Sequence, residues 1–276
     1  MKSVTRSLAL ALVAGALALP LHAQLSYKVT VQNLGSATPT GLYHSPVWLG
    51  FHNGSFDLFN SGSAASAGLE ALAELGDSSG IAAAFAAAQP SGLSMTLNDP
   101  AGPGPGIFAP GRSRSATVTL NATNNRYLSF GAMIVPSNDS FVANGNPLAL
   151  ELFDASGHSL GAQSWTFTGA NVWDAGTEQN DPMNGAAFVA GVDAMLGTSE
   201  GGVVHLQPLD GLDNVIGLET PAGTTIGRAL TDAPLFRISI TPVPEPSTYG
   251  AIAAAALLGL VWWRRTRRNV PVAVRA

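Results

Sequence analysis

The chain has 276 residues, no cysteine and a formal net charge of −5 at pH 7. The lack of cysteine excludes disulfides, thiol catalysis and zinc sites built from cysteine. Between Gln24 and Val243 there are six basic residues and seventeen acidic ones, a net charge of −11, which argues against nucleic acid as a partner because phosphate binding depends on Lys and Arg. This charge favours cations as ligands, or serves only to keep the protein soluble.

Residues 1–23 have the pattern of a secretory signal peptide. Lys2 and Arg6 precede an almost wholly apolar run from Leu8 to Leu19, and small residues lead to Ala23, where we expect cleavage. We therefore expect an exported mature protein that begins at Gln24.

Residues 24–242 are predicted to form one mainly β domain, an antiparallel β-sandwich. Short runs in which apolar and polar residues alternate are separated by Gly, Pro, Asn and Ser, which is typical of strands in a sandwich. The expected strands lie within residues 27–31, 47–51, 116–120, 127–134, 148–153, 165–167 and 236–240.

Residues 63–88 interrupt this pattern and predict a helical insertion. The segment is rich in Ala and Leu, and Leu69, Leu72 and Leu75 fall on one side of a helix. Residues 76–80 contain turn formers and separate a second helical run through Phe85. We expect two short helices packed on one edge or end of the sandwich.

Several motifs that suggest catalysis have a better structural interpretation, so we expect no enzyme. The Gly- and Pro-rich segment 100–111 precedes a strand, whereas a phosphate-binding loop must open a helix. Residues 157–161 match GxSxG, but strands lie on both sides, and a nucleophile elbow requires a helix after the serine. The histidines share no metal-ligand spacing and are interpreted as structural.

Two acidic loops are the strongest candidates for a binding site. Asp139 follows a predicted strand, while Asp174 and Glu178 lie four residues apart around Gly176. Ca²⁺ takes about six to eight oxygen ligands from carboxylates, carbonyls and waters, which such loops supply. The segment from Asp174 is not an EF-hand, because Gly176 stands where an oxygen ligand belongs. Taken alone, both loops are as well explained as solvated turns.

The same loops belong to longer segments that resemble a known family. Residues 45–76 (SPVWLGFHNGSFDLFNSGSAASAGLEALAELG), 131–142 (GAMIVPSNDSFV) and 172–178 (VWDAGTE) are similar, in this order, to the spondin N-terminal domain. The resemblance implies a C2-like β-sandwich and a bound Ca²⁺ ion with three carboxylate ligands, Asp139, Asp174 and Glu178. In that family an Asp generally follows "WDAGT" where this chain has Glu178, and a proline is common in place of Asn138.

The C-terminal residues carry three features in a fixed order. Val243, Pro244, Glu245 and Pro246 are followed by an apolar run from about Gly250 to Trp263, and then by an arginine cluster that includes Arg264 and Arg265. This order resembles the PEP-CTERM sorting tail of Gram-negative bacteria. The resemblance assigns 243–268 to the sorting segment, leaves 269–276 as a short tail, and implies cleavage by an exosortase-like membrane protease.

The apolar part of this tail is short for a permanent membrane anchor. A helix of about fourteen residues extends about 20 Å, whereas the hydrocarbon core of a bilayer is about 30 Å thick. The tryptophans and arginines at its end suit a membrane boundary with the basic end inside. We therefore expect transient membrane association, with a permanent C-terminal anchor as the alternative.

These patterns predict a secreted, Ca²⁺-binding module of the cell surface or extracellular matrix with a structural or adhesive role. Its candidate partners are surface polysaccharide and envelope proteins. The alternative is a carbohydrate-binding or glycan-active protein of the exopolysaccharide layer, in which Trp48, Trp165 and Trp173 stack on sugars and paired carboxylates act as acid and base. Because Trp48 and Trp165 lie in strand-like runs, we expect them to pack in the core instead.

Overall fold

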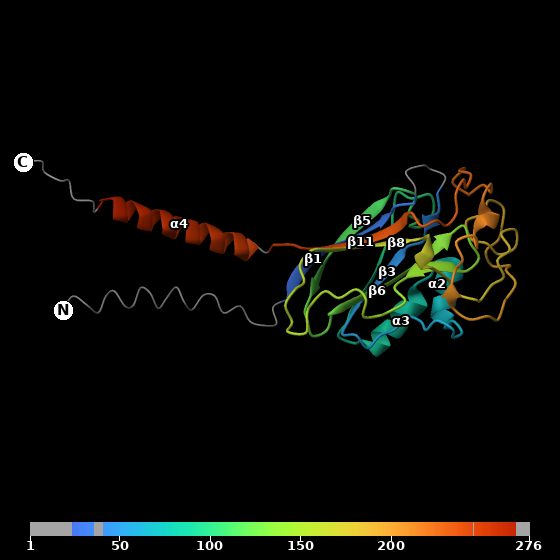
Figure 1. Cartoon of the computed structure of the whole chain (residues 1–276), viewed down its shortest axis with the longest axis horizontal. Coiled ribbons are helices and arrows are strands. Elements are labelled where there is room, and N and C mark those ends of the chain that lie inside the picture. The colour runs from blue at the N-terminus through green and yellow to red at the C-terminus, as the bar shows by residue number, and fades with distance from the viewer. Residues whose placement is uncertain (1–23, 36–40, 245, 269–276) are drawn as a thin grey trace, which may run out of the picture.

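A computed structural model describes residues 24–35, 41–244 and 246–268 (Figure 1). The predicted signal segment with Ala23, and Glu245 of the sorting motif, lie outside the described residues. The fold is mainly β, with two antiparallel sheets and a few short helices, as the alternating pattern predicts.

The first sheet has four strands in the order β5-β1-β11-β8. Its strands are β1 (Leu25–Asn33), β5 (Ser113–Leu120), β8 (Gln163–Thr168) and β11 (Pro234–Pro242). The second sheet has seven strands, with the path β10-β9-β7-β6-β3-β4 and β2 paired to β6. Its strands are β2 (Tyr43–His44), β3 (Val47–His52), β4 (Leu93–Leu97), β6 (Tyr127–Val135), β7 (Ser140–Ala143), β9 (Val172–Asp174) and β10 (His205–Leu206).

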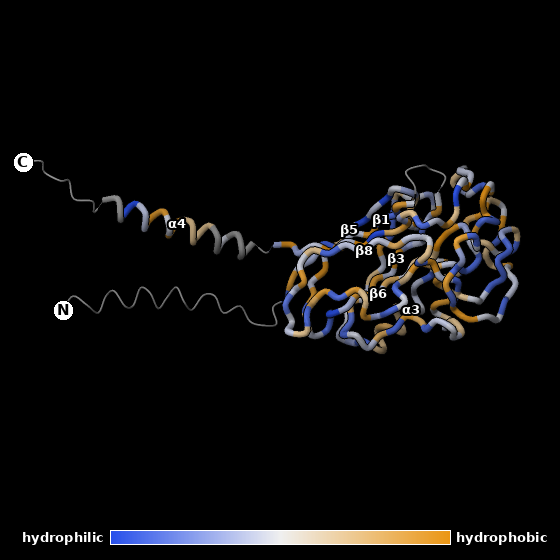
Figure 2. Tube along the Cα trace, viewed as in Figure 1, coloured by the Kyte–Doolittle hydropathy of each residue, from blue (hydrophilic) through white to orange (hydrophobic). Residues whose placement is uncertain are grey.

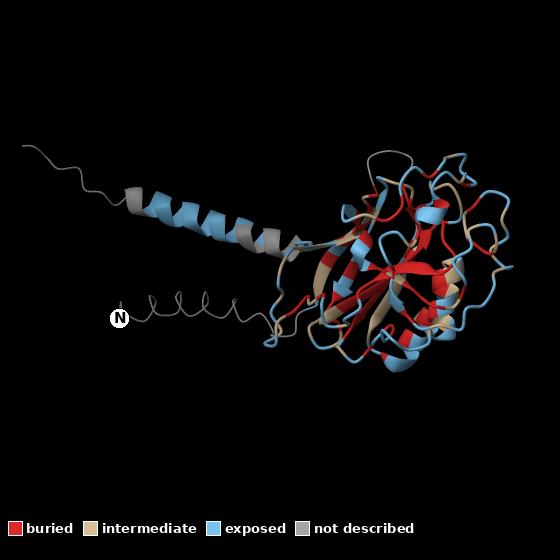
Figure 3. Ribbon diagram, turned by 45° about the vertical axis from the view of Figure 1, so that its right-hand side comes forward, coloured by how far each residue is buried: buried red, intermediate tan, exposed pale blue. Residues whose placement is uncertain are grey.

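The main core lies between the two sheets. Along β1 the side chains of Tyr27, Val29 and Val31 are buried, while the residues between them face outward, as expected for a strand with one solvated face. Phe130 of β6 stacks on Phe236 of β11 with ring centroids 5.3 Å apart, so the two sheets meet through aromatic contacts. Buried segments fill the centre of the domain in Figure 3.

Helices α2 (Ala67–Leu75) and α3 (Ser79–Ala88) cover the other side of the seven-stranded sheet and lie within the predicted helical insertion. The Ser66 hydroxyl accepts a hydrogen bond from the Leu69 amide and caps α2, which ends at Gly76 in the left-handed conformation. Trp48, Phe85 and Leu72 belong to the second core that these helices form with the sheet. Because both of its faces are covered, β6 is buried from Leu128 to Val135.

One predicted strand is wrong. Residues 148–153 form isolated bridges, Tyr127 with Glu151 and Phe153 with Ser159, and no regular strand. Leu148 is exposed while Leu150, Leu152 and Phe153 are buried, so the segment does not keep one apolar face. The short strands β2, β4, β7, β9 and β10 are not anticipated by the sequence pattern.

The Gly- and Pro-rich segment 100–111 forms a loop, as predicted. The fully buried carboxylate of Asp99 links the start of this loop to β5 through hydrogen bonds. It accepts hydrogen bonds from the guanidinium groups of Arg112 and Arg114, the shortest being 2.6 Å, and from the Ala101 amide. The arginines hold the pKa of Asp99 at about 2, well below its usual value.

Helix α4 (Pro246–Arg268) follows β11 and extends away from the sandwich (Figure 1). The Val243 amide donates to the Ser26 carbonyl at 2.7 Å, so the tail leaves the domain beside the start of β1. The described side chains of α4, among them Leu258 and Trp262, are exposed, and apolar residues precede the hydrophilic arginines along it (Figure 2). None of the helices in the described ranges is long and apolar enough to cross a bilayer.

Candidate functional site

The two acidic loops meet because of the strand register in the seven-stranded sheet. Residues 136–139 connect β6 to β7, and residues 175–178 follow β9. In the antiparallel pairing of β7 with β9, Ser140 lies opposite Asp174. This register places Asp139, one residue before Ser140, beside the turn that begins after Asp174.

Asp139 has a fully buried carboxylate in which only one of the two oxygens accepts hydrogen bonds. Its Oδ2 accepts hydrogen bonds from the Thr177 amide at 2.8 Å, the Glu178 amide at 3.1 Å and the Thr177 hydroxyl at 3.2 Å. Its Oδ1 is buried with no hydrogen-bond partner in the described part of the chain. Burial, and then the nearby charge of Asp174, raise the pKa of Asp139 to about 6.

Asp174 is also buried, at 1% exposure, and is held by its own turn. Oδ1 accepts a hydrogen bond from the Gly176 amide at 2.7 Å, and Oδ2 accepts one from the Asn180 side-chain amide at 2.9 Å. Gly176 has a positive φ of 66°, which glycine adopts without the steric cost of a side chain. The turn thus fixes the direction of the Asp174 carboxylate.

The Glu178 carboxylate lies in a tight slot between two glycines. A Cβ atom at Gly197 would lie 0.9 Å from Glu178 Oε1, and one at Gly185 would lie 2.5 Å from it, so only glycine fits beside this oxygen. Oε2 accepts a hydrogen bond from the Asn138 side-chain amide at 3.3 Å. Burial, followed by the charges of Glu74 and Asp139, raises the pKa of Glu178 to about 7.

Helix α2 brings further carboxylates to this region. Glu70 and Glu74 line a polar cleft together with Thr177 and Glu178. Burial raises the pKa of Glu74, opposed by a hydrogen bond from Thr177. Within the described ranges, no three His, Asp or Glu side chains are gathered closely enough to hold a metal ion by themselves.

The structure therefore brings together the three carboxylates that the sequence singles out, as neighbours rather than as a closed cage. Asp139 interacts electrostatically with Asp174, and Glu178 with Asp139. Sequence reasoning places Asn180 close behind the acidic segment without naming it as a ligand, and it missed Glu74. Asn180 lies six residues beyond Asp174 and bonds to its carboxylate, whereas no sequence signal links Glu74 on α2 to this loop.

The GxSxG segment forms a turn. The Gly157 amide donates to the Asp154 carbonyl, and His158 Nδ1 lies 3.2 Å from an oxygen of Asp154. The Ser159 hydroxyl accepts a hydrogen bond from the Tyr27 hydroxyl at 2.7 Å, and the next element along the chain is the strand β8. The arrangement fits a structural turn and not a nucleophile elbow.

Of the tryptophans considered for sugar stacking, Trp48 is buried, whereas Trp165 and Trp173 are partly buried and pack against the cores. Trp48 is fully buried and its Nε1 donates to the Ser94 hydroxyl at 2.9 Å. Trp165 packs against the main core, and Trp173 packs on Phe59 with ring centroids 4.9 Å apart.

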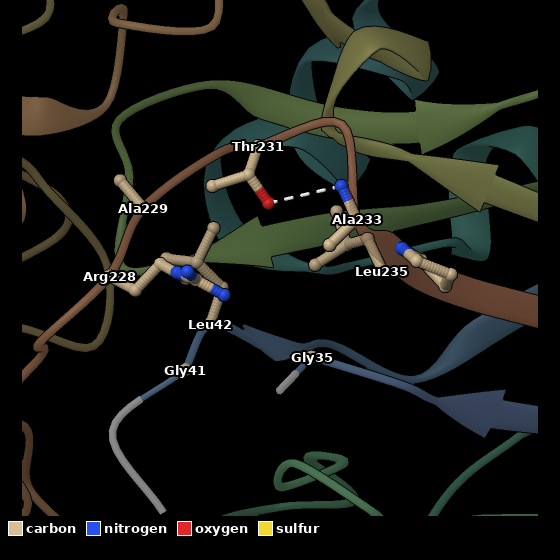
Figure 4. A pocket seen from close by; sticks show the side chains of 9 residues that line it. Gly35, Gly41, Leu42, Arg228, Ala229, Thr231, Ala233 and Leu235 are labelled. Carbon is tan, nitrogen blue, oxygen red and sulfur yellow. Dashed lines mark hydrogen bonds between the residues drawn. The ribbon is translucent and has the colours of Figure 1, made fainter. Parts of the chain in front are cut away.

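A separate pocket lies where the chain enters β11 (Figure 4). Its wall consists mainly of small or apolar residues such as Gly35, Leu42 and Ala233, and Arg228 is the charged residue among the described lining residues. The Thr231 hydroxyl accepts a hydrogen bond from the Ala233 amide at 3.2 Å, which stabilises the turn. The described lining residues include no second ionisable group with which Arg228 could act.

Comparison with known proteins identifies the tail. Residues 242–265 match a family model described as the PEP-CTERM protein-sorting motif, and this match includes Val243, Pro244, Pro246, Arg264 and Arg265. No protein with a curated function matches the chain. The motif indicates an exported protein that an exosortase-type membrane enzyme sorts to the surface of a Gram-negative bacterium.

Proposed function

We propose that the sandwich is a non-enzymatic, Ca²⁺-binding module with a structural or adhesive role at the cell surface or in the extracellular matrix. The observation that carries this proposal is the buried Oδ1 atom of Asp139, which has no partner in the described part of the chain and belongs to a carboxylate close to Asp174. A buried acceptor without a donor costs about 1–3 kcal/mol, and more when it is charged. A bound cation offsets this cost.

The chemistry of the donors suits Ca²⁺, which prefers oxygen and tolerates irregular geometry. Asp139 and Asp174 would hold the ion, and carbonyl or water oxygens would complete the shell, since two carboxylates alone do not. The resemblance of residues 45–76, 131–142 and 172–178 to the spondin N-terminal domain, with its C2-like fold, supports this assignment and adds Glu178 as a third ligand. The ion would supply positive charge that neutralises the repulsion among these carboxylates.

The direction of the pKa shift gives the proposal a pH dependence. The pKa of Asp139 is raised from 3.8 to about 6 in the folded protein. In the ion-free protein this group therefore favours folding below pH 4, and that contribution, up to about 3 kcal/mol, is lost as the pH rises through 6. Bound Ca²⁺ restores stability above pH 6, where the carboxylate is charged.

Thermal unfolding in CaCl₂ and in EDTA tests the proposal. At pH 7.5 we expect Ca²⁺ to raise the melting temperature, and at pH 5 we expect a smaller rise. Asp139→Asn should abolish the response and should also stabilise the ion-free protein, because it removes a buried charge. Asp154→Asn, in a turn where the carboxylate is 42% exposed, is the matched control and should keep the response. Equal melting temperatures in CaCl₂ and EDTA for the unaltered protein would refute Ca²⁺ binding.

We also propose that α4 holds the chain at the membrane only until the exosortase-type enzyme cleaves near the Pro-Glu-Pro motif. Exposed Leu258 and Trp262 give the helix an apolar surface that no described part of the domain covers, and exposed Arg264 and Arg265 follow them. Replacing Pro244 and Pro246 by Ala should leave the unprocessed protein in the membrane fraction. Normal release of that variant would contradict the role of the motif.

A further inference from the structure

The outer face of the four-stranded sheet is covered by hydroxyl groups. Along each of its strands, inward apolar residues alternate with outward Ser and Thr, and Figure 3 shows buried and exposed bands alternating there. We name this surface the hydroxyl face. Its hydroxyl residues are Ser26, Thr30, Ser113, Ser115, Thr117, Thr119, Ser164, Thr166, Ser239 and Thr241.

The strand register arranges these hydroxyl groups in rows. One row crosses all four strands, because Ser115 lies opposite Thr30, Thr30 opposite Ser239, and Ser239 opposite Ser164. Thr30 and Ser115 share a hydrogen bond of 2.8 Å, and Ser164 and Ser239 share one of 3.0 Å. Adjacent positions in a row are about 4.8 Å apart, and rows repeat about every 6.7 Å along the strands.

Such an array is ordered before any ligand arrives. The side chains are short, they are mounted on a paired sheet, and several are already bonded to a neighbour. These side chains therefore lose little conformational entropy when a ligand binds. In water, each hydroxyl contact contributes little binding free energy. A ligand built from repeating units therefore binds best, because it makes many such contacts at once.

The charge on the hydroxyl face differs from that of the rest of the domain. Its only charged residues are Lys28 and Arg237, and no carboxylate projects from the same side of these four strands. Elsewhere Arg112 and Arg114 pair with Asp99, and Arg126 pairs with Glu151. Within the described ranges neither Lys28 nor Arg237 has an acidic partner, although Arg237 donates to the Thr166 hydroxyl at 3.3 Å.

The carboxylates of the candidate site lie on the other side of the sandwich. Glu70 and Glu74 are on α2 and Asp174 ends β9, all part of or packed on the seven-stranded sheet. Stacked sheets are about 10 Å apart, so these carboxylates lie at least that far from a ligand on the hydroxyl face. A negatively charged ligand on the hydroxyl face is therefore closer to the two cations that lack an acidic partner than to the carboxylates of the candidate site.

We propose that the hydroxyl face binds an extended polysaccharide that carries carboxylate groups. The rows of Ser and Thr exchange hydrogen bonds with the sugar hydroxyls, and Lys28 and Arg237 pair with the sugar carboxylates. The face has no aromatic residue, so stacking plays no part in recognition. The proposal goes beyond the Ca²⁺ site and does not depend on it, because none of the residues involved is near Asp139.

Native gel electrophoresis of the full chain tests this proposal. Either hyaluronate or neutral dextran is cast in the gel, and EDTA and a nonionic detergent are present throughout. EDTA removes any contribution from Ca²⁺ bridging. We expect hyaluronate to retard the protein and dextran to leave its migration unchanged. The variant Lys28→Gln/Arg237→Gln should bind hyaluronate at least about fivefold more weakly, while Arg228→Gln, which removes an exposed cation outside the face, should bind normally.

A second pair of variants tests the hydroxyl rows. Thr30→Val keeps a β-branched side chain but removes one hydroxyl group from the central row, and should weaken binding about two- to fivefold. Thr123→Val, in an exposed turn outside the face, is its control. Melting curves should be the same for all variants.

Three results would overturn the proposal: no retardation of the unaltered protein by hyaluronate, equal retardation by dextran, or equal losses in the face variants and their controls. Failure of the Ca²⁺ experiment leaves this test unaffected, because it is run in EDTA.

Discussion

At the scale of single residues, His52 shows how the second core accommodates a buried polar group. The Gly54 amide donates to Nδ1 at 3.1 Å, and Nε2 lies 3.0 Å from the Ser129 hydroxyl. A backbone amide can only donate, so Nδ1 carries no proton and the ring is neutral with its proton on Nε2. Burial lowers the pKa of His52 to about 4.

We predict that His52 remains neutral until the pH approaches 4. Its folded pKa lies below the unfolded value of 6.5, so its contribution to stability is complete above pH 6.5 and is lost as the pH falls toward 4. The loss is on the order of 3 kcal/mol. NMR of the imidazole nitrogens measures the pKa directly, and a midpoint above pH 6 would contradict the assignment. His52→Gln, which cannot titrate, should show a weaker acid dependence of unfolding than the unaltered protein.

The residues of the candidate site differ in how far the sequence reveals them. Asp139, Asp174 and Glu178 lie in loops whose composition and family resemblance single them out, and the structure brings these loops together. Glu74 and Gly197 reach the same place from segments about one hundred and about twenty residues from Glu178. Their positions depend on the packing of α2 and of the loop after Glu178, which no local spacing encodes.

At the scale of elements, α2 and α3 cover one face of the seven-stranded sheet, and α2 also positions acidic residues. Leu72 on α2 is fully buried, and its Cδ2 lies 2.9 Å from the position that a Cβ atom at Gly131 would occupy. Glycine at this point of β6 therefore allows the helix to approach the sheet closely. The same helix carries Glu70 and Glu74 to the polar cleft, so its packing also positions the acidic groups.

We predict that Leu72→Ala destabilises the protein by about 2–5 kcal/mol, because it leaves a cavity between α2 and β6. Leu75→Ala is the matched control: it lies one helical turn later and its side chain is 46% exposed, so its cost should be below about 1 kcal/mol. Urea unfolding monitored by fluorescence measures both. Similar losses for the two variants would mean that α2 does not pack through Leu72.

Regular alternation made five of the seven expected strands easy to predict, and the Ala- and Leu-rich composition did the same for the helices. Residues 47–51 also form part of a strand, β3. Residues 148–153 failed because their burial depends on contacts with β6 and not on a strand repeat: the Leu128 amide donates to the Leu150 carbonyl, and the Leu152 amide to the Arg126 carbonyl. Strands as short as β9 and β10 are stabilised by their neighbours, so their own residues carry little signal.

At the scale of the whole molecule, the sandwich and the sorting tail are physically separate. Where the tail leaves the sheet, the Val243 amide donates to the Ser26 carbonyl. Beyond it, the described side chains of α4 are exposed and take no part in either core. Cleavage near the Pro-Glu-Pro motif would therefore release a domain whose cores are intact and whose charge, without the tail arginines, is strongly negative.

This separation predicts how truncation affects stability. A protein of residues 24–244 should melt within about 2 °C of one that retains the tail, since a loss of 1 kcal/mol shifts a domain of this size by about 2–4 °C. A second truncated protein, of residues 24–235, is compared with it. This shorter protein lacks Phe236, Ile238 and Ile240, which are buried in the main core, and it leaves β1 and β8 without the strand that joins them. It should not fold, as circular dichroism would show. A melting temperature for residues 24–244 that is lower by 10 °C or more would instead mean that α4 contributes to the stability of the sandwich.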